Sequence, residues 1–210
     1  MSTGAGHRES AARGHLRIYL GYAPGAGTTC ALLSEGHRRA EHGTDVVVAH
    51  VETQGRPHIQ ALFGGLEVIL PATATHRGTV VEEMDLGAVL ARNPQVAQVD
   101  DFAHRNVPGA PHAWRWQDAA ALMAAGIEVI STVSIGHLDS LADVVVRITG
   151  AVPRQSVPDP VVRAADEIEM VDLAPEALRD RMGERPDLLA ARSRGDAGRL
   201  VPDREPVGAA

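Results

Sequence analysis

The sequence predicts an α/β domain with a mostly parallel sheet. Short apolar runs alternate with helix-like stretches along most of the chain, a pattern typical of strands joined by crossover helices. Apolar residues make up 44% of the 210 residues and aromatic residues only 3%, so the core must be packed from Val, Leu, Ile and Ala. Both observations favour one domain built on a Val-rich, buried sheet.

Each expected element follows from its local pattern. Strands are expected at the apolar runs 16–20, 45–51, 66–70, 96–99, 127–133 and 168–173. Helices are expected at 28–41, where Gly43 follows as a stop, and at 84–92, 113–125 and 175–182. The segment 107–111 is expected to turn, because two prolines and a glycine crowd into it. The domain is expected to cover 15–182, between flexible polar ends at 1–14 and 183–210.

Composition excludes several function classes. The net charge of -7 argues against a nucleic-acid partner, and a single cysteine, Cys30, excludes an internal disulfide and a cysteine-rich zinc site. No apolar stretch approaches about 18 residues, and the first 14 residues lack the apolar segment of a signal peptide. We therefore expect a cytoplasmic protein without membrane insertion.

All twenty basic residues are arginine, and the chain contains no lysine. Biased codon usage accounts for most of this composition. The chemical consequence holds either way: the chain cannot supply the lysine of a phosphate clamp or of a Schiff base.

A glycine-rich segment at 21–29, GYAPGAGTT, lies between an expected strand and an expected helix. Glycines let the chain curl around an anion so that successive backbone N–H groups point at it. This context predicts a P-loop-like, phosphate-binding turn. The candidate cofactor-binding residues are Pro24, Gly25, Ala26, Gly27, Thr28, Thr29 and Cys30.

The turn departs from a complete Walker A motif at two positions. Tyr22 stands where the motif has a small residue and Thr28 where it has lysine, whereas Gly27 and Thr29 match. The lysine neutralises the β- and γ-phosphates, and a hydroxyl offers a hydrogen bond without the charge. Losing such a charge-assisted hydrogen bond costs about 1.5–3 kcal/mol, or roughly one to two decades in affinity. Hydrolysis is expected to suffer more than binding.

A second motif resembles Walker B, although Gln98 interrupts its apolar run. Residues 96–101 read VAQVDD, an apolar strand that ends in acids. Asp100 is expected to hold Mg²⁺ together with Thr29, and Asp101 is the candidate catalytic residue that would orient an attacking water. A glycine turn alone fits an unliganded strand–helix junction equally well, and acids at strand ends are often merely solvated. The two motifs together favour a site for ATP or another nucleotide with Mg²⁺.

Further segments resemble one known family, the N-terminal cytoplasmic domain of the KdpD sensor kinases, which govern bacterial potassium uptake. The turn resembles the family's GxAPGxGKT, VETQGR at 51–56 resembles VETHGR, and DDFAHRNVPG at 100–109 resembles DELAHxNxPG. RWQD at 115–118 matches the family, and TVSIGHLDSL at 132–141 resembles TVNxQHLESL. The resemblance covers about residues 15–182.

This resemblance implies a P-loop NTPase-like, three-layer domain that binds ATP and tunes the kinase-to-phosphatase balance of a receptor. A sensor kinase or a potassium transport protein is the implied partner. Thr28, Asp101 and Gln54 replace the family's lysine, glutamate and histidine, which weakens the expectation of ATP binding and, more strongly, that of turnover. We expect a domain without the kinase core of a full receptor, either a stand-alone relative, which is the preferred interpretation, or a fragment of a decayed receptor.

Three functions remain open from the sequence. The first is a regulatory nucleotide-binding module, the second a protein-interaction module that has lost its nucleotide, and the third a weak NTPase. The third needs a cation from Arg17, Arg38, Arg56 or another subunit to replace the lysine.

Other chemistry-bearing residues have plainer interpretations. Ten histidines show no zinc-binding spacing, and His104, His112 and His137 are kept as residues that could line the site. Cys30 is interpreted as a small packing residue and Trp116 as a packing anchor. Glu52 and Arg56 could reach a ligand from a strand end or form an ion pair with each other.

Overall fold

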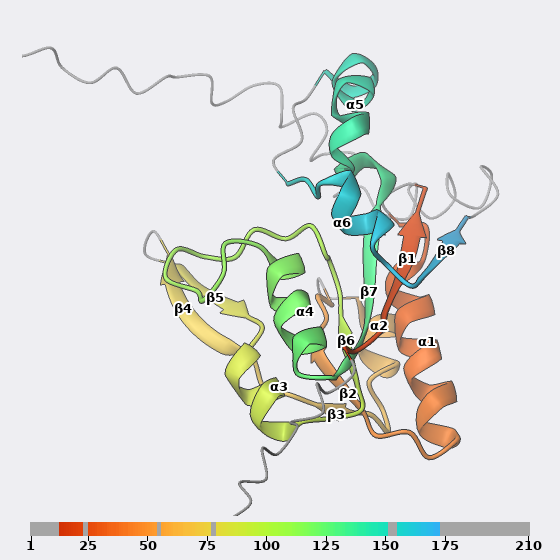
Figure 1. Cartoon of the computed structure of the whole chain (residues 1–210), viewed down its shortest axis with the longest axis vertical. Helices are drawn as coiled ribbons and strands as arrows, with labels where there is room; N and C mark the ends of the chain where they lie inside the picture. The colour runs from red at the N-terminus through yellow and green to blue at the C-terminus, as the bar shows by residue number, and fades with distance from the viewer. Residues whose placement is uncertain (1–12, 23–24, 54–55, 77–78, 151–154, 173–210) are drawn as a thin grey trace, which may run out of the picture. The chain divides into compact units, whose positions relative to one another are not determined.

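A parallel six-stranded sheet forms the centre of the computed structural model (Figure 1). The structure describes residues 13–22, 25–53, 56–76, 79–150 and 155–172. The strands are β1 (Leu16–Gly21), β2 (Val46–His50), β3 (Glu67–Val68), β6 (Val96–Val99), β7 (Glu128–Ser134) and β8 (Glu167–Val171). Their order across the sheet is β3-β2-β6-β7-β1-β8, and every neighbouring pair is parallel. The predicted mostly parallel sheet is therefore confirmed.

Helices cover the two faces of this sheet, which makes three layers. Helix α1 (Thr28–Glu41) lies on one side, and α3 (Leu86–Arg92) and α4 (Arg115–Ala124) lie on the other (Figure 1). The remaining helices are α2 (Pro57–Ala61), α5 (Ala142–Thr149) and α6 (Asp159–Arg163), with short 3-10 turns η1 (Ile135–His137) and η2 (Asp139–Leu141). Strands β4 (Ala72–His76) and β5 (Thr79–Glu83) form a separate antiparallel hairpin.

The alternation of side chains along the strands builds a core on each face. Ile18, Val47, Ala97 and Val129 pack in the cluster that includes residues of α3 and α4. Their strand neighbours Tyr19, Val46, Val96 and Ile130 pack in the cluster that includes Leu32 of α1. Because successive side chains of a strand point to opposite faces, apolar residues at every position are needed to bury both faces. This explains why the strands are rich in Val and Ile at successive positions.

Local signals set the helix ends. Gly27, with φ 101°, precedes α1, and Gly43, with φ 83°, follows it, so both ends use a conformation that glycine adopts easily. Asp85 caps α3 by accepting a hydrogen bond from the Ala88 N–H at 2.8 Å. Asn93, in the left-handed region with φ 49°, ends the same helix.

Most expected elements are present with shifted ends, and several were missed. Helix 28–41 and strand 96–99 have the predicted bounds, and 107–111 turns with Gly109 at φ 99°. The strand expected at 66–70 is reduced to two residues. The β4–β5 hairpin and helices α2, α5 and α6 were not predicted, because elements of five to eight residues contain too few positions for periodicity to identify them. The helix expected at 175–182 lies outside the described residues.

Candidate phosphate and metal site

The glycine loop joins the carboxyl end of β1 to the first turn of α1. Gly25 and Gly27 adopt φ values of 87° and 101°, which side chains with a Cβ rarely tolerate. The first helical hydrogen bond at this end runs from the Ala31 N–H to the Gly27 carbonyl at 3.0 Å. The N–H groups of Thr28, Thr29 and Cys30 precede it, so no earlier turn of the helix accepts from them. Such N–H groups at a helix N-terminus attract anions.

The candidate cofactor-binding residues differ in exposure. Ala26 and Thr29 are buried, whereas Gly25, Gly27, Thr28 and Cys30 are partly exposed. Pro24 lies outside the described residues. The side chain of Tyr22 is 62% exposed and therefore does not fill the loop. Cys30 packs against the small cluster of Leu33, Val48 and Ile59, in agreement with its interpretation as a packing residue.

Thr29 and Asp100 are in contact although the strands that precede them, β1 and β6, are not neighbours in the sheet. The Thr29 hydroxyl donates to Asp100 Oδ2 at 3.1 Å, and β7 lies between β1 and β6 in the sheet. The intervening strand contributes Thr132, whose hydroxyl donates to Asp100 Oδ1 at 2.5 Å. The same hydroxyl accepts the Asp101 N–H at 3.0 Å. Carboxyl ends of parallel strands share one edge, which is where ligands of open α/β sheets bind.

The Asp100 carboxylate is almost completely enclosed, with 6% of the residue exposed. Burial raises its pKa, and the hydrogen bonds from Thr132 and Thr29 act in the opposite direction. A buried carboxylate beside a hydroxyl is suited to a cation, because both supply the oxygen ligands that Mg²⁺ prefers. Thr29 and Asp100 thus lie together in the structure, and their role as magnesium ligands stays a prediction.

Asp101 sits on a sharp turn directly after the strand. Its φ of 54° lies in the left-handed region, which is uncommon for a residue other than glycine. Its side chain is 29% exposed, and Oδ2 lies 3.9 Å from His104 Nδ1. The side chains of Asp100 and Asp101 therefore differ in environment, one enclosed and the other open to solvent at the same edge. The catalytic role of Asp101 stays a prediction.

Sequence reasoning missed a buried ionic cluster next to these acids. The Glu83 carboxylate accepts from Arg115 Nη2 at 2.9 Å, from His104 Nε2 at 3.0 Å and from the Val107 N–H at 3.1 Å. Burial acts to raise the pKa of Glu83, but the hydrogen bond and charge of His104 and the charge of Arg115 outweigh it and lower that pKa. Arg115 is fully buried, and its Nη1 donates to the Asp100 carbonyl at 3.4 Å. Glu83 carried no sequence signal, since it lies in a hairpin that periodicity did not reveal.

Comparison with known proteins adds an independent result. The family model described as "Osmosensitive K+ channel His kinase sensor domain" matches residues 12–191. The chain belongs to this family. The resemblance to the KdpD family that the motifs indicated is thereby confirmed.

Individual KdpD relatives extend over nearly the same residues. The sensor protein KdpD of Mycobacterium tuberculosis H37Rv is 54% identical over 170 residues, which make up 81% of this chain and 20% of that relative. The putative sensor protein KdpD of Synechocystis is 45% identical over 172 residues, 82% of this chain and 46% of that relative. The sensor protein KdpD of Escherichia coli K12 is 45% identical and covered over 19% of its length. The chain spans less than half the length of these relatives.

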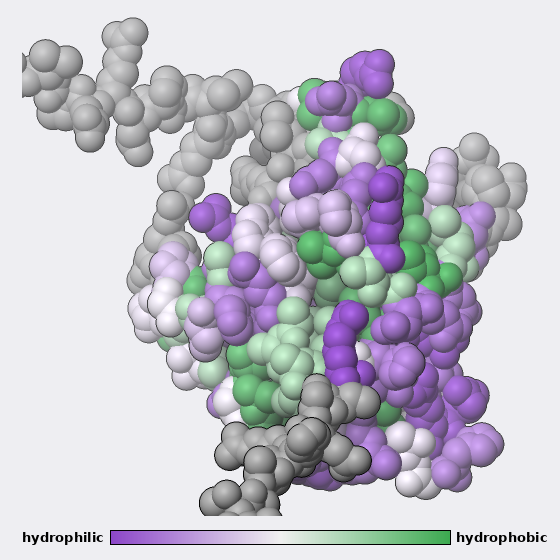
Figure 2. Space-filling view, in the orientation of Figure 1, coloured by the Kyte–Doolittle hydropathy of each residue, from purple (hydrophilic) through white to green (hydrophobic). Residues whose placement is uncertain are grey.

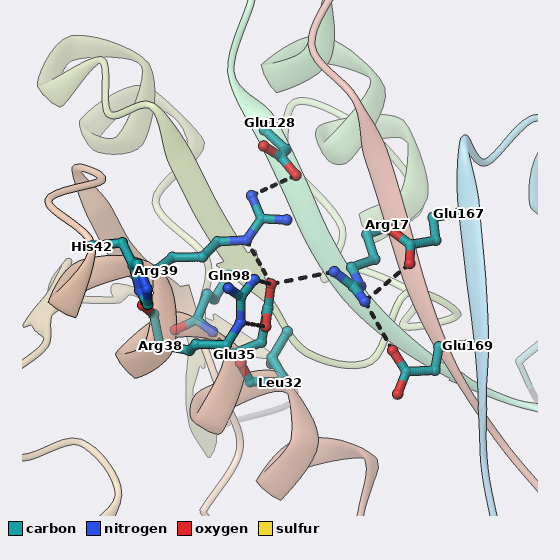
Figure 3. Close-up of polar contacts among 10 residues, drawn as sticks. All are labelled: Arg17, Leu32, Glu35, Arg38, Arg39, His42, Gln98, Glu128, Glu167 and Glu169. Atoms are coloured by element: carbon teal, nitrogen blue, oxygen red, sulfur yellow. Dashed lines mark hydrogen bonds and ion pairs between the residues drawn. The ribbon is translucent and has the colours of Figure 1, made fainter.

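Two arginines considered as substitutes for the missing lysine are held elsewhere in this KdpD-family domain. Both Arg17 and Arg38 bind Glu35, at 3.2 and 2.7 Å (Figure 3). Arg38 lies ten residues after Thr28, about 15 Å along the helix. The surface over α1 is largely hydrophilic (Figure 2), as its charged outer residues require. Arg17 and Arg38 are therefore wrong as replacements for the lysine in this structure.

Arg56, the third candidate, stabilises the chain turn after β2. Its guanidinium donates to the carbonyls of Thr53 and Glu52 at 2.9 and 3.0 Å. Arg56 thus contacts the backbone of Glu52, and the ion pair or ligand contact considered for these two side chains stays a prediction. His50, the last residue of β2, was not considered from the sequence. Its pKa is lowered to about 3 by burial and by the charges of Arg115 and His104, so the imidazole is neutral at neutral pH.

The RWQD segment of the KdpD family lies at the start of α4 and holds the preceding turn. The Trp114 N–H donates to Gln117 Oε1 at 3.0 Å, and Asp118 accepts from Asn106 Nδ2 at 2.6 Å and contacts His112 Nδ1 at 2.7 Å. Trp116 packs against the core on the α4 face, as expected of a packing anchor. His112 thus contributes to this turn, and its contacts do not extend to the glycine loop.

The described residues contain no group of three or more His, Cys, Asp or Glu side chains placed to hold a metal ion. Within the same part of the chain, no helix is long and apolar enough to cross a membrane.

Proposed function

We propose that this domain is a nucleotide-responsive regulatory module of KdpD-type potassium sensing. Backbone N–H groups of residues 25–30 hold the phosphates, and Thr29 and Asp100 hold Mg²⁺. The observation that carries the proposal is the 3.1 Å hydrogen bond from Thr29 to Asp100, which joins the first turn of α1 to the acid that follows β6. When bound, Mg²⁺ would offset part of the phosphate charge.

The residues of the glycine loop support nucleotide binding without efficient hydrolysis. The amide groups at the start of α1 do not depend on the residue type at position 28, so they can contact an anion without a lysine. Transition-state charge on a transferred phosphoryl group needs a cation close by. Arg17 and Arg38 are both bound to Glu35, which supports a regulatory role over a catalytic one.

The proposed context is two-component control of potassium uptake. The relatives are sensor proteins by name, and the present chain corresponds to only part of their length. We propose that the domain acts on a sensor kinase or a potassium transport protein, with nucleotide occupancy deciding which conformation it presents. The proposed location is the cytoplasm, where nucleotides are available.

The second candidate is an interaction module that keeps the fold and has lost the nucleotide. Thr28 favours it, because a charge-assisted contact is replaced by a neutral one at a cost of about 1.5–3 kcal/mol. This candidate predicts that partner binding is independent of nucleotide and unchanged by Asp100→Ala.

Titration with MgADP and MgATP, read as a shift in Tm, separates the two candidates. Ligand at about a hundredfold excess over its Kd stabilises the folded state by roughly 2.7 kcal/mol. Thr28→Lys is expected to tighten binding by roughly 10- to 100-fold. Thr44→Lys is the matched control, since it adds the same charge at the amino end of β2. The glycine loop lies at the other end of the strands, after the carboxyl end of β1.

The outcomes are distinct. A Tm shift that grows in Thr28→Lys and stays at the wild-type level in Thr44→Lys supports the nucleotide site. If millimolar nucleotide shifts neither wild type nor Thr28→Lys, the loop is not a phosphate site and the interaction module stands. A phosphate-release rate above background in wild type that Asp101→Asn abolishes would instead indicate a weak NTPase.

A further inference from the structure

Glu83 connects the β4–β5 hairpin to the turn that carries both candidate acids. It is the last residue of β5, only 8% exposed, and accepts hydrogen bonds from a side chain of α4 and from two positions in the segment after β6. One donor, Arg115, also binds the Asp100 carbonyl, and another, His104, faces Asp101. A single side chain therefore lies between Glu83 and each acid: Arg115 links it to Asp100, and His104 links it to Asp101.

We infer that Glu83 is a positioning residue of the candidate metal site, holding the Asp100–Asp101 turn through Arg115 and His104 and coupling the β4–β5 hairpin to that site. This inference rests on the proposed function, since it describes how the same site is shaped. In the described part of the chain, Glu83 contacts Arg115, His104 and the Val107 N–H.

The charge of Glu83 is needed at this position. Arg115 is 0% exposed, and a buried guanidinium without a carboxylate partner is strongly unfavourable. The Glu83 oxygens divide their contacts, Oε2 binding Arg115 and Oε1 binding the Val107 N–H. A carboxylate supplies acceptors in both directions, whereas an amide would offer its NH₂ group to one of these donors.

Among the hairpin residues whose burial the structure describes, only Glu83 is buried. Val80 is 68% exposed, and most residues from Thr79 to Glu82 are exposed as well. Glu83 and the adjacent Met84, 8% exposed, are where this segment enters the core. An event that tightens the Asp100 turn is therefore transmitted to β5 through the Glu83 contacts, and an event on the hairpin is transmitted in reverse.

The test compares ADP affinity with and without Mg²⁺ in the full chain. In Glu83→Gln we expect the magnesium-dependent gain in affinity to fall by roughly 10- to 100-fold, the range found when groups that orient metal ligands are removed. The metal-free affinity should be retained, because the amide groups of residues 25–30 belong to a different element. Glu82→Gln is the matched control, since Glu82 is the exposed neighbour on the same strand.

If Glu83→Gln weakens ADP binding equally with and without Mg²⁺, or weakens neither, the positioning role of Glu83 is wrong. The nucleotide site proposed from wild-type binding would still stand. If wild type binds ADP neither with nor without Mg²⁺, the proposed function and this inference fall together. Equal effects of Glu82→Gln and Glu83→Gln would also overturn the inference, since the effect would then follow charge alone.

If Glu83→Gln does not fold, hydrogen exchange on the wild-type protein tests whether the β4–β5 hairpin is coupled to the candidate site. MgADP is expected to slow exchange of the amides of β5 and of Val107, relative to those of β3. Protection confined to the glycine loop, with β5 unchanged, would show that the hairpin is not coupled to the site.

Discussion

Glu35 is a carboxylate of α1 that binds several arginines while only 8% exposed. Arg38 and Arg39 approach from the same helix, each at 2.7 Å, and Arg17 approaches from β1 at 3.2 Å (Figure 3). The hydrogen bond from Arg38 lowers the pKa of Glu35 to about 2 despite burial, with further contributions from Arg39 and Arg17. One residue thus fixes α1 to the face of the sheet.

The sign of the resulting pH dependence follows from the lowered pKa. Glu35 stabilises the fold above its unfolded pKa, and this stabilisation is lost as the pH falls from about 4.5 to about 2. In Glu35→Gln the free energy of unfolding near neutral pH should fall by about 1.5–3 kcal/mol, and the gap to wild type should close over that acid window. Urea unfolding across this pH range measures the gap. Glu41→Gln, an exposed change on the same helix, is the control, and a gap that stays constant with pH would contradict the assignment.

At the scale of elements, α1 approaches β6 closely where Gly36 faces Gln98. A Cβ at Gly36 would lie 2.6 Å from Gln98 Cδ, closer than real side chains pack. Gln98, which is fully buried, donates through Nε2 to the Leu32 carbonyl. The polar residue that interrupts the Walker B-like strand therefore has a structural role against the helix that carries the glycine loop.

Gly36→Ala should destabilise the domain by about 1–3 kcal/mol through overpacking, although alanine is the better helix former by about 1 kcal/mol. In a Gln98→Val background the same substitution should become neutral or stabilising, because the obstructing amide is gone. Chemical denaturation of the two single variants and the double variant measures this coupling. Additive effects would show that Gly36 and Gln98 do not limit each other.

At the scale of the whole molecule, position in the sheet decides how much a strand residue contributes. Ile130 of β7 is completely buried in the α1-face core, whereas Ile168 of β8, the edge strand, is 44% exposed. The same residue type thus occupies two extremes of one sheet. Ile130 lies on a strand with a neighbour on each side and Ile168 on a strand with one.

Truncation of isoleucine to alanine should lower the free energy of unfolding by different amounts at positions 130 and 168. Ile130→Ala should lower the free energy of unfolding by about 2–5 kcal/mol, the range for cavities in a packed core. Ile168→Ala should cost less than about 1 kcal/mol, since most surface changes have small effects. Equal costs would mean that β8 is packed as tightly as the centre of the sheet, and calorimetry on both variants distinguishes the cases.

Local sequence patterns predicted the fold class and two residues of the candidate site, Thr29 and Asp100. The apolar runs and the glycine turn predicted five strands, β1, β2, β6, β7 and β8, together with α1, because their signals lie within a few residues of one another. Thr29 and Asp100 were paired by motif, 71 positions apart. Thr132 was noted only as part of a family-like segment, and nothing in its neighbourhood marked it as the link between Asp100 and Asp101.

The sequence by itself determined the alternation of strands and helices, the α/β class, the absence of lysine and the glycine-rich segment between β1 and α1, since each depends on residue type and short spacing. Only the tertiary structure decided that β7 separates β1 from β6, that Arg115 contacts both Glu83 and the Asp100 carbonyl, and that Arg17 and Arg38 bind Glu35. These contacts join segments far apart in the chain, and their partners are selected by strand order and helix packing, which short-range periodicity does not encode.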